Sequence, residues 1–184
     1  MTVRPALRIR RGSLSRIFKV ENSKGSGTGF TIVTPSGKIR VITNAHVCGA
    51  DKFLLMEFDK KSEILVVRKV SKEYDLCLMG TNLNIAFKLA VLQNLGSNVV
   101  VEGFPLGLHK INTGRLEEYH LYQTPDKEYH ASLSYSNTCD YGSSGSPIVN
   151  MEGEVVGVIN KIVLETKQGI GIPLIFLKDF LEGE

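Results

Sequence analysis

The sequence has no tryptophan, only three cysteines and six prolines, and no run of 18 or more apolar residues along its 184 positions. The missing apolar run excludes a helix that spans a membrane, and we expect no membrane partner. The first eleven residues carry four arginines and a proline where a signal peptide would have its apolar centre. Secretion is therefore not indicated, and we expect an intracellular, cytoplasmic location.

The cysteines, Cys48, Cys77 and Cys139, form an odd set without paired spacing. This pattern argues against a disulfide framework and predicts reduced, mostly buried thiols in an intracellular protein. His46 lies two positions before Cys48, but no second close His/Cys pair completes a tetrahedral site. We therefore expect no metal.

Composition describes a globular protein of one domain or two small subdomains, with 42% hydrophobic and 22% charged residues. Residues 1–19 contain six Lys/Arg and no acid, whereas the rest has 16 basic and 19 acidic residues. Leu7 and Ile9 alternate with arginines, which favours a solvated edge strand whose charges discourage aggregation. Binding of nucleic acid or an acidic partner by this basic arm is the alternative.

Short β-branched and aromatic runs, separated by Gly, Asn, Asp and Pro, predict an all-β sandwich or barrel. The clearest runs are 30–33, 39–43, 64–67, 75–79 and 155–159. The rhythm breaks over residues 80–96, which we interpret as a crossover between two β halves. Leu174, Leu177 and Leu181 recur at helical spacing after Pro173, and they predict a short amphipathic helix packed on the core.

The segment 142–147, Gly-Ser-Ser-Gly-Ser-Pro, is typical of a turn, but it also suits a nucleophile on a tight loop. Glycine permits positive φ, so that neighbouring N–H groups can point at an oxyanion. A serine needs a base, usually a histidine that a carboxylate holds in one tautomer. His46 follows a predicted strand and Asp75 begins one. The order His46, Asp75, Ser144 is that of the chymotrypsin-type triad.

Seven segments strengthen this interpretation, and together they cover roughly residues 27–178. They are Gly27-Thr28-Gly29-Phe30, Thr43-Asn44-Ala45-His46-Val47, Tyr74-Asp75-Leu76-Cys77-Leu78, Gly103-Phe104-Pro105-Leu106-Gly107, Gly142 to Pro147, residues 153–160 and Gly169-Ile170-Gly171-Ile172-Pro173. With these motifs the chain resembles a trypsin-like (chymotrypsin-fold) serine protease, closest to the protease domain of the HtrA/Deg family.

The resemblance implies two six-stranded antiparallel β-barrels with the cleft between them and a short C-terminal helix. We expect a basic N-terminal arm over residues 1–19, the first barrel over 20–90, and the second barrel with the helix over 91–184. The implied activity is that of a serine endopeptidase that acts on polypeptides without a metal or organic cofactor.

The resemblance also assigns roles in the site. Ser144 would form the acyl-enzyme, His46 would act as general base and then acid, and Asp75 would orient it. The backbone N–H groups of Gly142 and Ser144 would form the oxyanion hole. The residues implied to line the primary pocket are Thr138, Cys139, Tyr141, Asn160, Lys161 and Ile162. Thr138 near the pocket base implies an uncharged small or medium residue before the scissile bond, unless Thr138 and Cys139 merely pack the second barrel.

Several positions depart from the family pattern. Ser143 stands where secreted members carry the aspartate that accepts a new N-terminus, so activation by N-terminal cleavage is not expected. Cys48 is one residue too far from His46 for the usual histidine-loop disulfide. We expect no PDZ domain after the catalytic domain and therefore no peptide-gated regulation, and the oligomeric state is not predicted.

The motifs also allow other interpretations. Ser143 or Ser146 could be the nucleophile in place of Ser144. The chain could be a catalytically silent binding module with a protease fold, or a processing protease of the viral or phage type.

Overall fold

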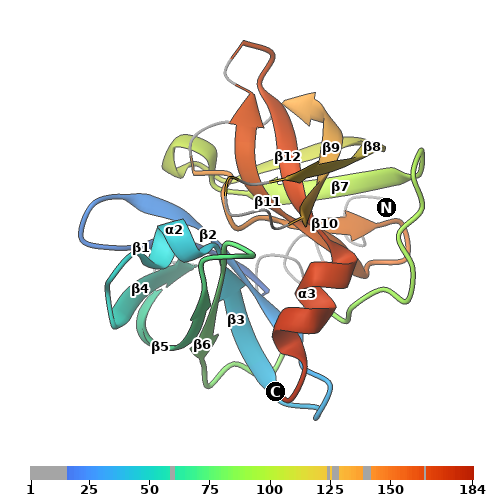
Figure 1. Cartoon of the computed structure of the whole chain (residues 1–184). Helices are drawn as coiled ribbons and strands as arrows, with labels where there is room; N and C mark the ends of the chain where they lie inside the picture. The colour runs from blue at the N-terminus through green and yellow to red at the C-terminus, as the bar shows by residue number, and fades with distance from the viewer. Residues whose placement is uncertain (1–15, 59–60, 124, 126–128, 139–141, 164) are drawn as a thin grey trace, which may run out of the picture.

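The computed structural model describes residues 16–184 except 59–60, 124, 126–128, 139–141 and 164. The described chain folds into two closed six-stranded barrels in which neighbouring strands are antiparallel, as Figure 1 shows. This architecture confirms the predicted fold class.

The first barrel contains strands β1 to β6, and its strand order is β1-β2-β3-β6-β5-β4. The strands are β1 (Ile17–Glu21), β2 (Ser26–Val33), β3 (Ile39–Thr43), β4 (Phe53–Phe58), β5 (Lys61–Ser71) and β6 (Leu76–Gly80). Because β1 begins at Ile17, the last residues of the basic N-terminal segment are part of this barrel. The alternating Leu7 and Ile9 lie outside the described residues.

The second barrel contains strands β7 to β12 in the order β10-β11-β12-β9-β8-β7. The strands are β7 (Asn98–Gly103), β8 (Lys110–Gln123), β9 (Tyr129–Thr138), β10 (Pro147–Asn150), β11 (Val155–Val163) and β12 (Gln168–Pro173). Residues 81–97 join the barrels without a strand of their own, as the break in the sequence pattern predicts.

Three short helices complete the described chain: α2 (Ala45–Cys48), the 3-10 turn η1 (Pro105–Gly107) and the C-terminal α3 (Leu174–Leu181). Helix α3 buries Leu174, Leu177, Phe180 and Leu181, so the predicted amphipathic helix is confirmed. Figure 1 shows it running from the second barrel down beside the first. Of the helices in the described chain, none is long and apolar enough to cross a membrane.

Each barrel has its own apolar core, and a third cluster joins them. Phe30, Ile42 and Leu78 of the first barrel share this joint cluster with Val158 and Ile172 of the second. Leu177, Phe180 and Leu181 of α3 also pack into it. Burial of side chains of this size contributes about 1.5–3 kcal/mol each, so the barrels are held together by a substantial apolar interface.

Candidate active site

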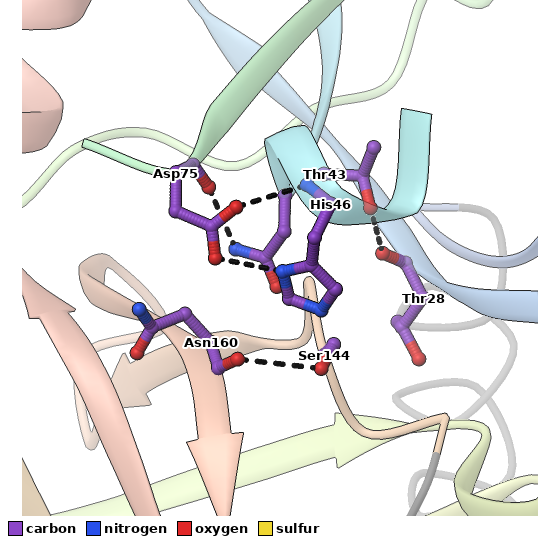
Figure 2. A network of polar contacts seen from close by, with 7 residues as sticks. Thr28, Thr43, His46, Asp75, Ser144 and Asn160 are labelled. Atoms are coloured by element: carbon purple, nitrogen blue, oxygen red, sulfur yellow. Dashed lines mark hydrogen bonds and ion pairs between the residues drawn. The ribbon is translucent and has the colours of Figure 1, made fainter. Parts of the chain in front are cut away.

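Two polar side chains of the first barrel, His46 and Asp75, are in direct contact. His46 lies in α2, directly after β3, and Asp75 directly precedes β6. Strands β3 and β6 are neighbours with Thr43 opposite Cys77, which brings the two segments together. The Nδ1 atom of His46 lies 2.7 Å from Oδ2 of Asp75 (Figure 2). Because a carboxylate only accepts, Nδ1 carries the proton and Nε2 is left as the free base of the neutral ring.

The backbone of His46 also binds this carboxylate. Its N–H donates to Oδ1 of Asp75 at 2.9 Å, so both carboxylate oxygens bind the same histidine. Two bonds fix the plane of the carboxylate and, through it, the orientation of the imidazole.

Ser144 comes from the second barrel and faces this pair. Figure 2 shows it beneath the imidazole of His46, on the side away from Asp75. Its hydroxyl donates to the backbone oxygen of Asn160 at 3.5 Å. Ser143 and Ser146 are 4% and 0% exposed, whereas Ser144 is only half-buried. Exposure therefore favours Ser144 among the three serines of the loop.

Thr28 of β2 anchors the serine loop to the first barrel. Its hydroxyl donates to the oxygen of Gly142 at 2.8 Å and accepts from the N–H of Phe104 at 3.0 Å. Its own N–H donates to the oxygen of Ser144 at 2.9 Å, and its carbonyl accepts from the hydroxyl of Thr43 at 2.7 Å. One fully buried threonine thus binds both barrels at the point where the site is formed.

Gly145 lies against this threonine so closely that no side chain fits. Its φ is +91°, and a Cβ there would lie 1.9 Å from the carbonyl oxygen of Thr28. Glycine is required at this position for both its conformation and its size.

The loop directs one N–H group away from the body of the turn. The oxygen of Ser143 accepts from the N–H of Ser146 at 3.0 Å, which closes the turn. The peptide unit between Ser143 and Ser144 is planar and trans, so the N–H of Ser144 points opposite to that carbonyl. This orientation suits the predicted oxyanion donor. The N–H of Gly142 belongs to a peptide shared with Tyr141, which lies outside the described residues, so its role stays a prediction.

The predicted pocket residues are only partly described. Asn160, Lys161 and Ile162 lie in β11, where the Asn160 backbone faces Ser144 and Ile162 packs on the core of the second barrel. Thr138 ends β9, opposite Gln168. Cys139 and Tyr141 lie outside the described residues, as does the neighbouring Asp140.

Cys48 and Cys77 form a disulfide, so the prediction of reduced thiols was wrong for these two residues. Cys48 is the last residue of the helix that carries His46. Cys77 is the second residue of β6 and lies two positions after Asp75. The two cysteines are 29 residues apart, which matches no spacing pattern typical of a disulfide. They pair because α2 and β6 are in contact. The intracellular location stays a prediction, and the argument from reduced thiols no longer supports it.

Tyr74, the residue before Asp75, binds the C-terminal helix. Its ring stacks on Phe176 with centroids 5.0 Å apart, and its hydroxyl donates to the carboxylate of Asp179. That hydrogen bond, together with burial and the nearby negative charges, raises the pKa of Tyr74 to about 12. Helix α3 thereby holds the turn that leads into Asp75.

The roles of Thr28 and Asn44 were not predicted from the sequence, although both residues lie in motifs that resemble those of the protease family. The available signal was a hydroxyl between two glycines in Gly27-Thr28-Gly29, and an amide just before His46. Neither residue type carries chemistry of its own, so only the contacts reveal what each one holds.

Two six-stranded barrels, with a His–Asp pair on one and a serine loop on the other, define the class of trypsin-like peptidases. The chain belongs to this family: the model of the trypsin-like peptidase domain matches residues 27–158.

The similar proteins include HtrA-type and DegP-like proteases. The chain is 29% identical to serine protease HTRA1B of Danio rerio over 185 residues, which covers 90% of this chain and 36% of that protein. It is 26% identical to a probable periplasmic serine endoprotease DegP-like of Hahella chejuensis over 165 residues, which covers 83% of this chain and 33% of that protein. The chain thus spans about a third of the length of these relatives.

Among solved structures, the fold is similar to the Rv3671c protease from M. tuberculosis in its active form. The TM-score is 0.81 at 22% identity, covering 94% of this chain and 82% of that chain. This likeness establishes the fold.

Proposed function

We propose that this chain is a serine endopeptidase domain that hydrolyses peptide bonds through an acyl-enzyme on Ser144. The observation that carries the proposal is the bidentate pair of His46 and Asp75, which faces the half-buried Ser144 across the junction of the barrels. The curated relatives, which are named serine proteases, support the same activity.

In this mechanism Nε2 of His46 takes the proton of the Ser144 hydroxyl as Oγ bonds to the substrate carbonyl carbon. The carbonyl oxygen becomes an oxyanion, which the N–H groups of Gly142 and Ser144 would stabilise. The C–N bond then breaks, and the leaving amine takes the proton from Nε2. Water repeats the sequence on the ester and releases the acid and the free serine. Asp75 stays ionised throughout and stabilises the imidazolium through Nδ1.

Replacing the nucleophile tests the proposal. We expect Ser144→Ala to lower kcat on a peptide substrate by about 10⁴–10⁶-fold and to abolish labelling by a fluorophosphonate probe. Mass spectrometry of the labelled wild-type protein should place the adduct on Ser144.

The control is Ser36→Ala, which changes a serine in the turn between β2 and β3, far from the site along the first barrel. It should be labelled at the wild-type rate. A well-folded wild-type protein that takes no label would instead identify a silent binding module, and an adduct on Ser143 or Ser146 would contradict the assignment of the nucleophile.

A further inference from the structure

Asn44, which joins β3 to α2, uses its side chain in an unusual way. It is fully buried and occupies the N-cap position of α2. An asparagine at an N-cap normally accepts a hydrogen bond from an N–H of the first helical turn. Asn44 makes no such bond, and its Nδ2 instead donates to the backbone oxygen of Asp75 at 3.0 Å. Its Oδ1 has no protein partner among the described residues.

The carboxylate of Asp75 replaces the missing cap. It accepts from the N–H of His46, the second helical residue, at 2.9 Å. The two segments therefore exchange partners: the side chain of Asn44 binds the backbone of Asp75, and the side chain of Asp75 binds the backbone of His46. This exchange resembles a capping box, except that its two halves lie 31 residues apart.

Asp75 needs such support because its backbone is strained. Its φ is +55°, in the left-handed region, which aspartate adopts more often than most residues but still at a cost relative to glycine. A residue in this conformation persists only where the surrounding contacts hold it. The bond from Asn44 fixes the carbonyl of Asp75, and thus the direction in which its side chain leaves the backbone.

We propose that Asn44 is a positioning residue, which sets the Asp75 carboxylate against Nδ1 of His46. This inference rests on the proposed function, because its consequence for turnover requires the endopeptidase activity. Asn44 is too buried to touch a substrate, so it acts only through Asp75. Without its donor, Asp75 is free to leave the left-handed region, and its carboxylate moves relative to the imidazole.

The test compares Asn44→Leu with Asn22→Leu. Leucine has nearly the shape of asparagine but no donor. Asn22 is the control, since its Nδ2 also donates to a carbonyl of α2, that of Val47 at 2.5 Å, and makes no bond to Asp75. Its Oδ1 accepts from the N–H groups of Lys24 and Gly25, so this variant also tests whether loss of a local turn alone affects turnover. We expect Asn44→Leu to lower kcat by about 10–100-fold with KM within about twofold, because a small misplacement of a catalytic group affects turnover rather than binding. Asn22→Leu should keep the wild-type kcat.

A second readout does not depend on activity. In the Ser144→Ala background, proton NMR should show the strongly downfield Nδ1–H resonance of His46 that its bond to Asp75 produces. We expect Asn44→Leu to shift or broaden this resonance and Asn22→Leu to retain it. If Asn44→Leu does not fold, Asn44→Asp keeps the shape, replaces the donor by an acceptor and should show the same loss of kcat.

The outcomes separate the two proposals. A wild-type kcat in a folded Asn44 variant, an unchanged resonance, or an equal loss in Asn22→Leu overturns the positioning role. A wild-type protein that neither turns over peptide nor reacts with fluorophosphonate overturns the proposed function, while the resonance still decides whether Asn44 holds the Asp75–His46 pair.

Discussion

At the scale of the residue, Thr28 has a larger role than its chemistry suggests. Its hydroxyl contacts two segments of the second barrel, the serine loop at Gly142 and the chain at Phe104, from a position in the first barrel. Both partners are backbone groups, and the hydroxyl is the only atom of the side chain that can serve as donor to one and acceptor from the other. The side chain therefore decides where the serine loop sits relative to His46.

We expect Thr28→Val to reduce the free energy of unfolding by about 1–3 kcal/mol, because it leaves the carbonyl of Gly142 and the N–H of Phe104 without their partner. It should also lower kcat by about tenfold or more, since the serine loop loses its anchor. Urea denaturation and peptide kinetics measure the two effects.

Thr31→Val is the matched control. Thr31 is also fully buried in β2, but its hydroxyl donates to the oxygen of Ile85 at 2.7 Å, outside the serine loop. It should lose similar stability and keep its kcat. Equal losses of kcat in the two variants would show that the effect of Thr28 is general destabilisation.

At the scale of the element, the disulfide connects the two segments that supply His46 and Asp75. It joins α2 to β6 and lies in the core of the first barrel with both cysteines fully buried. A cross-link lowers the conformational entropy of the unfolded chain. The resulting stabilisation of the folded state grows slowly with the length of the loop that the cross-link closes.

We expect the double variant Cys48→Ala/Cys77→Ala to lose about 3–4 kcal/mol of unfolding free energy, the loop-closure value for about 30 residues. Urea denaturation with and without reductant is the measurement. Reductant should destabilise the wild-type protein to a similar degree and leave the double variant unchanged. If reductant leaves the urea denaturation of the wild-type protein unchanged, this result contradicts the cross-link.

Helix α3 makes a pH-dependent contribution to the stability of the fold through its contact with Tyr74. The pKa of Tyr74 rises from 10.0 to about 12 on folding, chiefly because its hydroxyl donates to Asp179. The folded state thus holds this proton more tightly than the unfolded state. The contribution is complete below about pH 10 and is lost as the pH rises from about 10 to 12.

We therefore expect the stability difference between the wild-type protein and Tyr74→Phe to shrink over this alkaline range. Asp179→Asn, which removes the charge from the partner, should flatten the pH dependence in the same way. Unfolding free energies measured by denaturant at several pH values test both variants, and a difference that stays constant with pH would contradict the assignment.

At the scale of the whole molecule, the features that depend on local sequence patterns were predicted, whereas contacts between distant residues were not. β-branched runs predicted the strands, and the spacing of Leu174, Leu177 and Leu181 predicted the C-terminal helix. The surroundings of His46, Asp75 and Ser144 in the sequence singled them out, because strand ends and glycine turns place side chains at the rims of barrels. These features depend on residues that are near one another in the chain.

The unpredicted features depend on barrel closure and docking. The bond from Thr28 to Gly142 spans 114 residues, and its partner is a backbone atom that any residue possesses. The pairing of Cys48 with Cys77 follows from the neighbouring strands β3 and β6, which the odd cysteine count obscured. Asn44 is of a residue type that commonly caps helices. Its amide instead binds the carbonyl of Asp75, whose backbone is left-handed, and the sequence shows neither feature.

A hydrogen bond runs from the N–H of Thr28 to the oxygen of Ser144. It is a main-chain hydrogen bond between the barrels, so its proton becomes accessible to solvent only when the serine loop and β2 part. The exchange of this single amide with deuterium therefore reports how often the two halves of the site separate, independently of whether any substrate is being turned over.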